Sequence, residues 1–146
     1  LGRGERAFDY YLRINPSARE DLSDLHRCEP YVYAQMIAGK ESFKPGEAKN
    51  SWLTGTAAWN FVAITQHILG IKPDFDGLRI HPVVPPDWEG FSAVRSFRGV
   101  DYEIKVRREG PGNEVRLTVN GTPVAGTLVP LPAEGCRKVK VDVVLR

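Results

Sequence analysis

The chain has 146 residues, of which 42% are hydrophobic and 26% are charged, and its formal net charge is +2. These proportions exclude a mostly disordered or collagen-like chain, and no stretch approaches the roughly 18 consecutive apolar residues that span a membrane. Basic and acidic residues are balanced in both halves, so nucleic acid is not an expected partner, and without an apolar span a membrane is not expected either. The chain starts with leucine and lacks the apolar core of a signal peptide, so we expect a piece of a longer protein or a processed product.

The first half of the chain is predicted to be mainly helical. Arg3–Ile14 carries apolar residues at helical spacing, and Ser17–Leu25 is expected to form a short helix or a turn. Glu29–Ala38 has Pro30 in its first turn, where the missing N–H is harmless, and this predicts another helix. The polar segment Glu41–Asn50 is predicted to be a loop.

The clearest predicted helix covers Thr56–Leu69, because Gly70 follows it and Pro73 lies just beyond. Its apolar residues lie almost all round, which is typical of a helix buried among other helices. Too few helices are predicted before it to surround it. We therefore expect its natural neighbours to be missing from this chain or to be supplied by another chain.

From residue 73 onward the pattern changes to short strands separated by Gly and Pro turns. Asp101–Arg108 alternates apolar and charged residues, and Asn120-Gly121 is a strong hairpin turn signal. The basic run of Arg137 and Lys138 with Lys140 is interpreted as a solvated strand edge. Further strands are predicted over Leu78–Ile80, Phe91–Phe97, Glu114–Asn120, Val124–Val129 and Val139–Leu145. The predicted fold class is therefore α+β, with an antiparallel β-sandwich of jelly-roll type after the helices.

The segment Ser51–Thr56 leads into the predicted buried helix. The N-terminus of a helix has unpaired N–H groups and a partial positive charge, so it attracts anions. Thr54 would add a hydroxyl donor, and Gly55 would let an anion approach the backbone. One interpretation is a cradle for phosphate or a sugar phosphate. The other, which the local sequence favours, is a Thr cap followed by a Gly with no special role.

Glu29–Gln35 combines aromatic rings with carboxylate and amide groups, as carbohydrate sites do. The alternative interpretation is that Tyr31 and Tyr33 are core residues. The three histidines show no ligand spacing, so no metal site is predicted.

Several motifs follow one another in an order that resembles one family. They are Glu29–Gln35, Lys49–Trp59, Ile68–Ile71, Asp76–Arg79, Trp88–Phe91 and Phe97–Gly99, followed by Tyr102. The series resembles the C-terminal part of glycoside hydrolase family 94, formerly glycosyltransferase family 36, of the cellobiose and N,N′-diacetylchitobiose phosphorylase type. The resemblance covers nearly the whole chain.

The resemblance implies large cytoplasmic enzymes with an (α/α)6 barrel and a C-terminal jelly roll. Residues 1–72 would be the last helices of the barrel, and residues 73–146 the β-sandwich domain. Such enzymes cleave a β-linked disaccharide with inorganic phosphate as co-substrate, without another cofactor, and give an α-sugar 1-phosphate and a free sugar. Since phosphate is the nucleophile, one general acid suffices.

By the same resemblance, Thr54 and Gly55 match phosphate-binding positions, and Gln35 matches a glutamine that contacts the donor sugar. The general-acid Asp of the family belongs to a motif expected upstream of this chain, so no catalytic residue is assigned here. We expect the 146 residues alone to be inactive, and the sequence does not identify which disaccharide is cleaved.

Two other functions stay open. The chain could be a non-catalytic carbohydrate-binding or assembly module, which an exposed aromatic platform on the sheet would support, with Trp88, Phe91 and Phe97 as candidates. It could also be an interaction protein whose unpaired apolar helix forms a homodimer.

Overall fold

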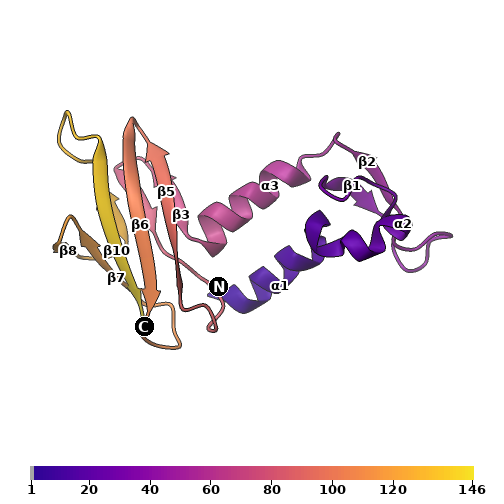
Figure 1. The fold of residues 1–146 in the computed structure, drawn as a ribbon, viewed down its shortest axis with the longest axis horizontal. Helices are drawn as coiled ribbons and strands as arrows, with labels where there is room; N and C mark the ends of the chain where they lie inside the picture. Colours follow the sequence, from indigo (N-terminus) through magenta and orange to yellow (C-terminus); the bar gives the residue numbers. More distant parts are fainter. Residues whose placement is uncertain (1) are drawn as a thin grey trace. The chain divides into compact units, whose positions relative to one another are not determined.

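The computed structural model describes residues 2–146 of the chain. It divides into two compact units, one formed by residues 6–63 and the other by residues 64–146 together with residues 2–5. The first unit holds most of the helical residues and one small hairpin, and the second holds two β-sheets (Figure 1). The predicted α+β class is confirmed. Among the described residues, no helix is long and apolar enough to cross a membrane.

The helical elements begin close to where the sequence predicts them. Helix α1 covers Gly4–Ile14, and the predicted short helix or turn is a 3-10 helix followed by one turn of α-helix. Asn15 caps the 3-10 helix, since its side chain accepts a hydrogen bond from the Ser17 amide. The elements of this region are α1 (Gly4–Ile14), η1 (Pro16–Leu22), α2 (Ser23–His26), β1 (Ala34–Ile37), β2 (Ala48–Ser51) and α3 (Thr56–Val62).

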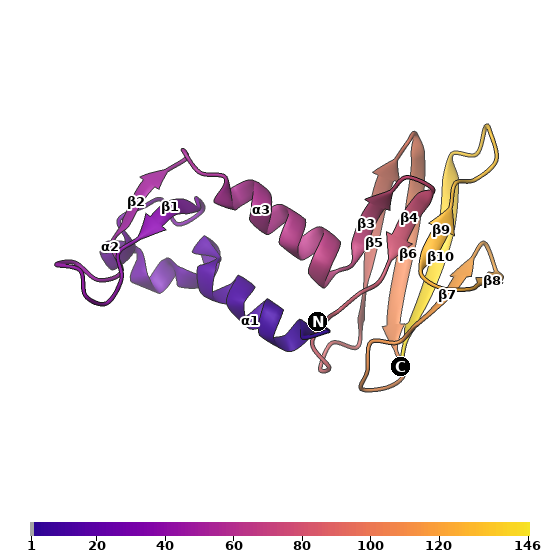
Figure 2. The ribbon, with the colours of Figure 1, turned by 180° about the vertical axis from the view of Figure 1, so that it is seen from behind.

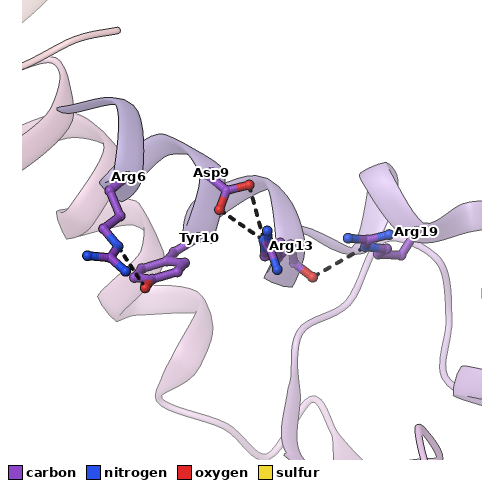
Figure 3. A network of polar contacts seen from close by, with 5 residues as sticks. All are labelled: Arg6, Asp9, Tyr10, Arg13 and Arg19. Carbon is purple, nitrogen blue, oxygen red and sulfur yellow. Dashed lines mark hydrogen bonds and ion pairs between the residues drawn. The ribbon is translucent and has the colours of Figure 1, made fainter. Parts of the chain in front are cut away.

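The exposed side of α1 carries polar contacts between side chains one helical turn apart (Figure 3). Arg13 Nε lies 3.0 Å from Asp9 Oδ2, and Arg6 Nε donates to the hydroxyl of Tyr10 at 3.1 Å. Arg19 Nε reaches back from η1 to the carbonyl of Arg13 at 3.4 Å. Such i,i+4 pairs stabilise a helix by only about 0.2–0.5 kcal/mol each, so they support α1 without fixing its position.

The helix predicted over Glu29–Ala38 is wrong. Residues 30–32 form a turn and bend, and Ala34–Ile37 is a strand, β1. It pairs antiparallel with β2, with Ala34 opposite Ser51 and Met36 opposite Lys49. Pairing with β2 satisfies the backbone groups of the strand, and this long-range contact outweighs the helical start signal of the proline. The predicted loop is accordingly wrong over its last three residues, which belong to β2.

The long apolar helix is present but has two parts. Helix α3 covers Thr56–Val62 and continues as a π-helical segment, η2, over Ala63–Ile68. Gly70 then ends it with φ +68°, and a Cβ there would lie 2.0 Å from the carbonyl oxygen of His81. Only glycine fits this position, so the predicted stop is confirmed.

In this chain the first part of the helix is uncovered, as expected if its natural neighbours are missing from the chain or are supplied by another chain. Within α3 only Asn60 is buried, and the side chains of Trp59 and Phe61 are 74% and 58% exposed. Asn60 satisfies its amide by donating to the Thr56 carbonyl at 2.9 Å. The apolar residues are exposed because nothing in the described chain covers this face of the helix, not because the sequence pattern is weak.

The β unit contains two sheets that form two layers (Figure 2). The larger sheet has the order β5-β6-β10-β7-β8, and the smaller has the order β3-β4-β9. The strands are β3 (Ile71–Asp74), β4 (Gly77–Ile80), β5 (Gly90–Phe97), β6 (Val100–Arg108), β7 (Val115–Val119), β8 (Thr122–Val124), β9 (Leu128–Pro130) and β10 (Lys138–Leu145).

Strand β10 departs from the prediction in two ways. It lies in the middle of the larger sheet, although its ladder with β7 begins only at Val141, beyond Lys138 and Lys140. It also runs parallel to β6, with Val141 opposite Ile104, so the sheet is not purely antiparallel. The lysines face outward from an internal strand, and Lys138 Nζ forms a 2.7 Å ion pair with Glu103 on β6.

The core of the β unit follows the predicted alternation. Tyr102, Ile104 and Val106 on β6 are all buried, as the sequence predicts. The Asn120-Gly121 turn is also confirmed, with φ of 48° and 84° at the two residues. The strand predicted over Val124–Val129 is instead interrupted, and its ends belong to β8 and β9 in different sheets.

Arg108, at the end of β6, holds together the loops at one end of this unit. Its Nε donates to the Trp88 carbonyl at 2.9 Å, and its terminal nitrogens donate to the Gly110 carbonyl and to Asn113 Oδ1. The carbonyls of Val84, Pro85 and Gly112 also accept hydrogen bonds from it. A guanidinium is suited to this role because it presents five N–H donors in a rigid plane.

Candidate functional site

Thr54 and Gly55 lie directly before helix α3. The Thr54 hydroxyl oxygen accepts a hydrogen bond from the Thr56 amide at 2.9 Å and lies 2.7 Å from the Thr56 hydroxyl. The Thr54 side chain therefore satisfies the first amide of α3, in line with the capping interpretation of the sequence, although the N-cap residue itself is Gly55. Because the Thr54 hydroxyl donates to the Thr56 hydroxyl, the pair leaves one hydroxyl proton, that of Thr56, at the start of the helix, where an anion would be attracted.

Gly55 is not required by the fold of the chain. Its φ is −73° and its ψ is −10°, values that any residue adopts, and a Cβ added there would meet only Trp59 Cδ1 at 3.7 Å. That distance is an ordinary van der Waals contact. Glycine is therefore not needed for the local backbone conformation. Its missing side chain leaves the backbone N–H groups at this exposed position accessible.

Gln35 lies in the middle of β1, and the hairpin register places it opposite Asn50 on β2. Asn50 Nδ2 donates to Gln35 Oε1 at 2.8 Å. Both residues are exposed, and Asn50 has φ +55°, in the left-handed region. Gln35 and Thr54 belong to the same unit. Gln35 forms its hydrogen bond with Asn50, and Thr54 forms its hydrogen bond with Thr56.

A second contact joins the turn before β1 to the segment after β2. Trp52 Nε1 donates to Glu29 Oε1 at 2.9 Å, and the Tyr31 ring meets the Trp52 ring edge-on with centroids 6.2 Å apart. The hydrogen bond from the indole is the main cause that lowers the pKa of Glu29 below its usual range. Glu29 is therefore a carboxylate at neutral pH, beside two exposed aromatic rings.

Tyr33 fits the core interpretation only in part. It is half-buried, and burial, with a smaller contribution from Tyr11, raises the pKa of Tyr33 to about 12. Tyr31 is instead 72% exposed, so the core interpretation is wrong for that residue. Within Glu29–Gln35, the accessible groups are therefore Tyr31 and Gln35.

The three aromatic residues predicted as candidates for a carbohydrate-binding platform do not form an exposed one. Trp88, Phe91 and Phe97 are only half-exposed, and Trp88 and Phe91 pack edge-on against each other at 6.5 Å. Across the outer face of the larger sheet, opposite charges face one another, as Lys138 and Glu103 do. This face is a self-neutralised, solvated surface. Within residues 2–146, no group of three or more His, Cys, Asp or Glu side chains is arranged to hold a metal ion.

Sequence reasoning missed two residues of this region, Asn50 and Trp52. Both were hidden because Glu29–Ala38 was predicted as a helix, which has no cross-strand partner. Had the hairpin been recognised, its register would have placed Asn50 opposite Gln35.

Comparisons with known proteins place the chain among carbohydrate-active enzymes. Residues 1–70 match the family described as "Glycosyl hydrolase 94 superfamily, catalytic domain". The chain is 40% identical over 134 residues to N,N'-diacetylchitobiose phosphorylase of Vibrio proteolyticus, an alignment that covers 89% of the chain. It is 41% identical over 145 residues, or 97% of its length, to solabiose phosphorylase of Paenibacillus borealis. It is also 36% identical over 124 residues, or 82% of its length, to cyclic beta-(1,2)-glucan synthase NdvB of Rhizobium meliloti.

The chain spans a small part of each of these relatives. The alignments cover 16% of the Vibrio phosphorylase, 19% of the solabiose phosphorylase and 4% of the glucan synthase. Their names share carbohydrate chemistry but differ in substrate and in reaction. What the matched segment contributes must therefore be argued from its own residues.

Proposed function

Because this chain belongs to the glycosyl hydrolase 94 superfamily, we propose that it is part of an inverting disaccharide phosphorylase and supplies part of its phosphate and donor-sugar site. The substrates would be a β-linked disaccharide and inorganic phosphate, and the products an α-sugar 1-phosphate and a free sugar. The phosphorylases among the relatives support this reaction class, at about 40% identity. The alternative of a free-standing carbohydrate-binding module is weaker, since its candidate aromatic residues are half-buried.

The proposed reaction needs an oxyanion held on one face of the sugar and a proton donor on the other. A phosphate oxygen attacks the anomeric carbon, the glycosidic C–O bond breaks, and the leaving oxygen takes a proton from a general acid. Thr54 and Gly55 would hold the phosphate through the hydroxyl and backbone N–H groups, and Gln35 would contact the donor sugar. The general acid would come from a part of the enzyme outside this chain.

For the architecture, we propose that residues 1–72 are helices of an (α/α)6 barrel and residues 73–146 a jelly-roll-like β domain. The exposed apolar face of α3 supports this assignment. Trp59 is 74% exposed, although the pattern of α3 is that of a helix surrounded by others. Further barrel helices would cover that face in the whole enzyme. A cytoplasmic location and a homodimer stay predictions.

The observation that carries the phosphate proposal is the combination at Thr54 and Gly55. Thr54 alone is explained by capping, because its oxygen accepts from the Thr56 amide. Gly55 is not explained by the fold, because its backbone is ordinary and a Cβ would fit. What distinguishes Gly55 is its place directly before a helix, where a missing side chain lets an anion approach the first backbone N–H groups closely.

The experiment is a titration of the ¹⁵N-labelled chain with inorganic phosphate, followed by NMR. We expect saturable shifts of the Thr54–Thr56 amides in the unmodified chain. Gly55→Ala should abolish them while leaving the spectrum of the hairpin and the β unit unchanged. Gly39→Ala is the matched control, because a Cβ at this other exposed glycine has nothing within 4 Å. Equal phosphate responses in both variants would refute the cradle.

A second experiment tests the dependence on the rest of the enzyme. The chain is incubated with N,N′-diacetylchitobiose or cellobiose and phosphate, and sugar 1-phosphate is measured. We expect no turnover above background, because the general acid lies outside the chain. Clear turnover would show that the catalytic machinery is contained in these 146 residues.

A further inference from the structure

The β1–β2 hairpin brings two exposed amide side chains together. Ala34 pairs with Ser51 and Met36 with Lys49, so Gln35 and Asn50 stand opposite each other between these pairs. Their side chains are joined by the 2.8 Å hydrogen bond from Asn50 Nδ2 to Gln35 Oε1. Nothing buries this bond, so it is not part of a core. The two amides nevertheless restrain each other's orientation.

The bonded pair presents complementary groups to the solvent. When Asn50 donates to Gln35, the Gln35 NH₂ group remains as a donor and the Asn50 carbonyl oxygen remains as an acceptor. The exchanged orientation, with Gln35 donating, also leaves one NH₂ group and one carbonyl oxygen. In both orientations the pair therefore offers a donor and an acceptor side by side.

The backbone around Asn50 is unusual for a strand end. Asn50 and Trp52 both have positive φ, 55° and 69°, on either side of Ser51. Asparagine tolerates this conformation better than most residues, whereas tryptophan does not. The indole hydrogen bond to Glu29 accompanies the strained Trp52 backbone. Strained residues of this kind are concentrated at ligand-binding positions, and these two lie in the sequence shortly before Thr54.

We propose that Asn50 is a sugar-binding residue that acts with Gln35 as a single hydrogen-bonded unit. The matching ligand is a pair of neighbouring hydroxyl groups on a pyranose ring, since hydroxyls both donate and accept. Inorganic phosphate at neutral pH offers mainly acceptors, so the pair suits the sugar and not the phosphate. This inference rests on the proposed function, and it adds Asn50 to the donor-sugar site.

The test uses the ¹⁵N-labelled chain and three separate probes: D-glucose, N-acetyl-D-glucosamine and inorganic phosphate. Side-chain NH₂ resonances of Gln35 and Asn50 are followed together with the backbone amides of Thr54 and Gly55. We expect both side-chain resonances to shift with one common midpoint when a sugar is added. Phosphate alone should move the Thr54 and Gly55 amides instead.

Three variants separate a binding role from a structural one. Asn50→Gly keeps the left-handed backbone and removes the amide, Gln35→Ala removes the partner, and the third variant combines both changes. Each single change should weaken sugar binding roughly 3- to 10-fold, the effect of losing one or two neutral hydrogen bonds. The double variant should be no weaker than the weaker single variant, because the amides act as one unit.

Met36→Ala is the matched control on the same hairpin. It removes an exposed side chain that pairs with Lys49 and not with the amide pair. Sugar binding should be unchanged in this variant, and cross-strand NOEs between Ala34 and Ser51 should persist in all variants.

The possible results are distinguishable. If the sugar binds and Asn50→Gly has no effect, or if the two single effects add, the inference is overturned. If phosphate moves Thr54 and Gly55 while no sugar moves the amide pair, the inference is overturned and the phosphate proposal stands. If neither probe binds, the proposed function itself fails, and the role of Asn50 fails with it.

Discussion

The indole N–H of Trp52 lies 2.9 Å from the carboxylate oxygen of Glu29 and donates a hydrogen bond to it. The contact joins residues 23 positions apart and fastens the two ends of the β1–β2 region to each other. It predicts a dependence on pH, because the carboxylate is the acceptor and its pKa is lowered.

Acid should weaken the hydrogen bond between the Trp52 indole and the Glu29 carboxylate. A carboxyl group whose pKa is lower in the folded chain contributes stability above its unfolded pKa of about 4.3. That contribution is lost as the pH falls through the lower folded pKa. We therefore expect the indole N–H resonance of Trp52 to shift with a midpoint below the usual glutamate range. In Glu29→Gln the shift should be absent, while a midpoint at or above the usual range would contradict the assignment.

Arg108 should be far more important for stability than the arginine beside it. It donates to backbone carbonyls of several loops, including those of Trp88 and Gly110. Arg108→Lys keeps the charge but loses the planar donor array, and we expect it to lower the free energy of unfolding by about 2–3 kcal/mol. Arg107→Lys, at an exposed neighbouring position, should change it by less than about 0.5 kcal/mol. Equal effects in urea unfolding would show that Arg108 is not an anchor.

The two units should differ strongly in local stability. Most buried apolar residues belong to the β unit, including Leu78, Ile104 and Val143, whereas the buried apolar side chains described in residues 6–63 are those of Pro16, Val32 and Ala48. Amide hydrogen exchange should therefore be slowest in β10 and about 100-fold or more faster in β1 and β2. Similar protection in both units would mean that the helical unit is stable without further helices around it.

The sequence predicted well those features of the fold that are determined by neighbouring residues in the chain. Strand β6 was predicted well, because its own alternation around Tyr102 and Ile104 determines which face is buried. Gly70 was predicted as a helix end for a similar local reason, since its positive φ and the nearby His81 carbonyl admit no side chain. Local signals of this kind need no knowledge of distant partners.

The errors concern features that depend on partners elsewhere in the chain. Strand β1 was mistaken for a helix because only its pairing with β2 makes it a strand. The central place of β10, parallel to β6, likewise follows from long-range topology, and Lys138 looks the same on an edge or an internal strand. In the candidate site, Thr54, Gly55 and Gln35 came from the order of motifs, whereas Asn50 emerged only from the hairpin register.

The central claim is that this chain supplies the phosphate and donor-sugar positions of a disaccharide phosphorylase. The most direct measurement uses a chimera of the Vibrio proteolyticus N,N'-diacetylchitobiose phosphorylase, to which this chain is 40% identical. In the chimera, this chain replaces the matching segment of that enzyme. The folded chimera should form sugar 1-phosphate from N,N′-diacetylchitobiose in a phosphate-dependent reaction. Gly55→Ala within the exchanged segment should raise the KM for phosphate at least about tenfold, and Gly39→Ala should not. A folded chimera whose KM for phosphate is the same with Gly55 and with Ala at position 55 would contradict the claim.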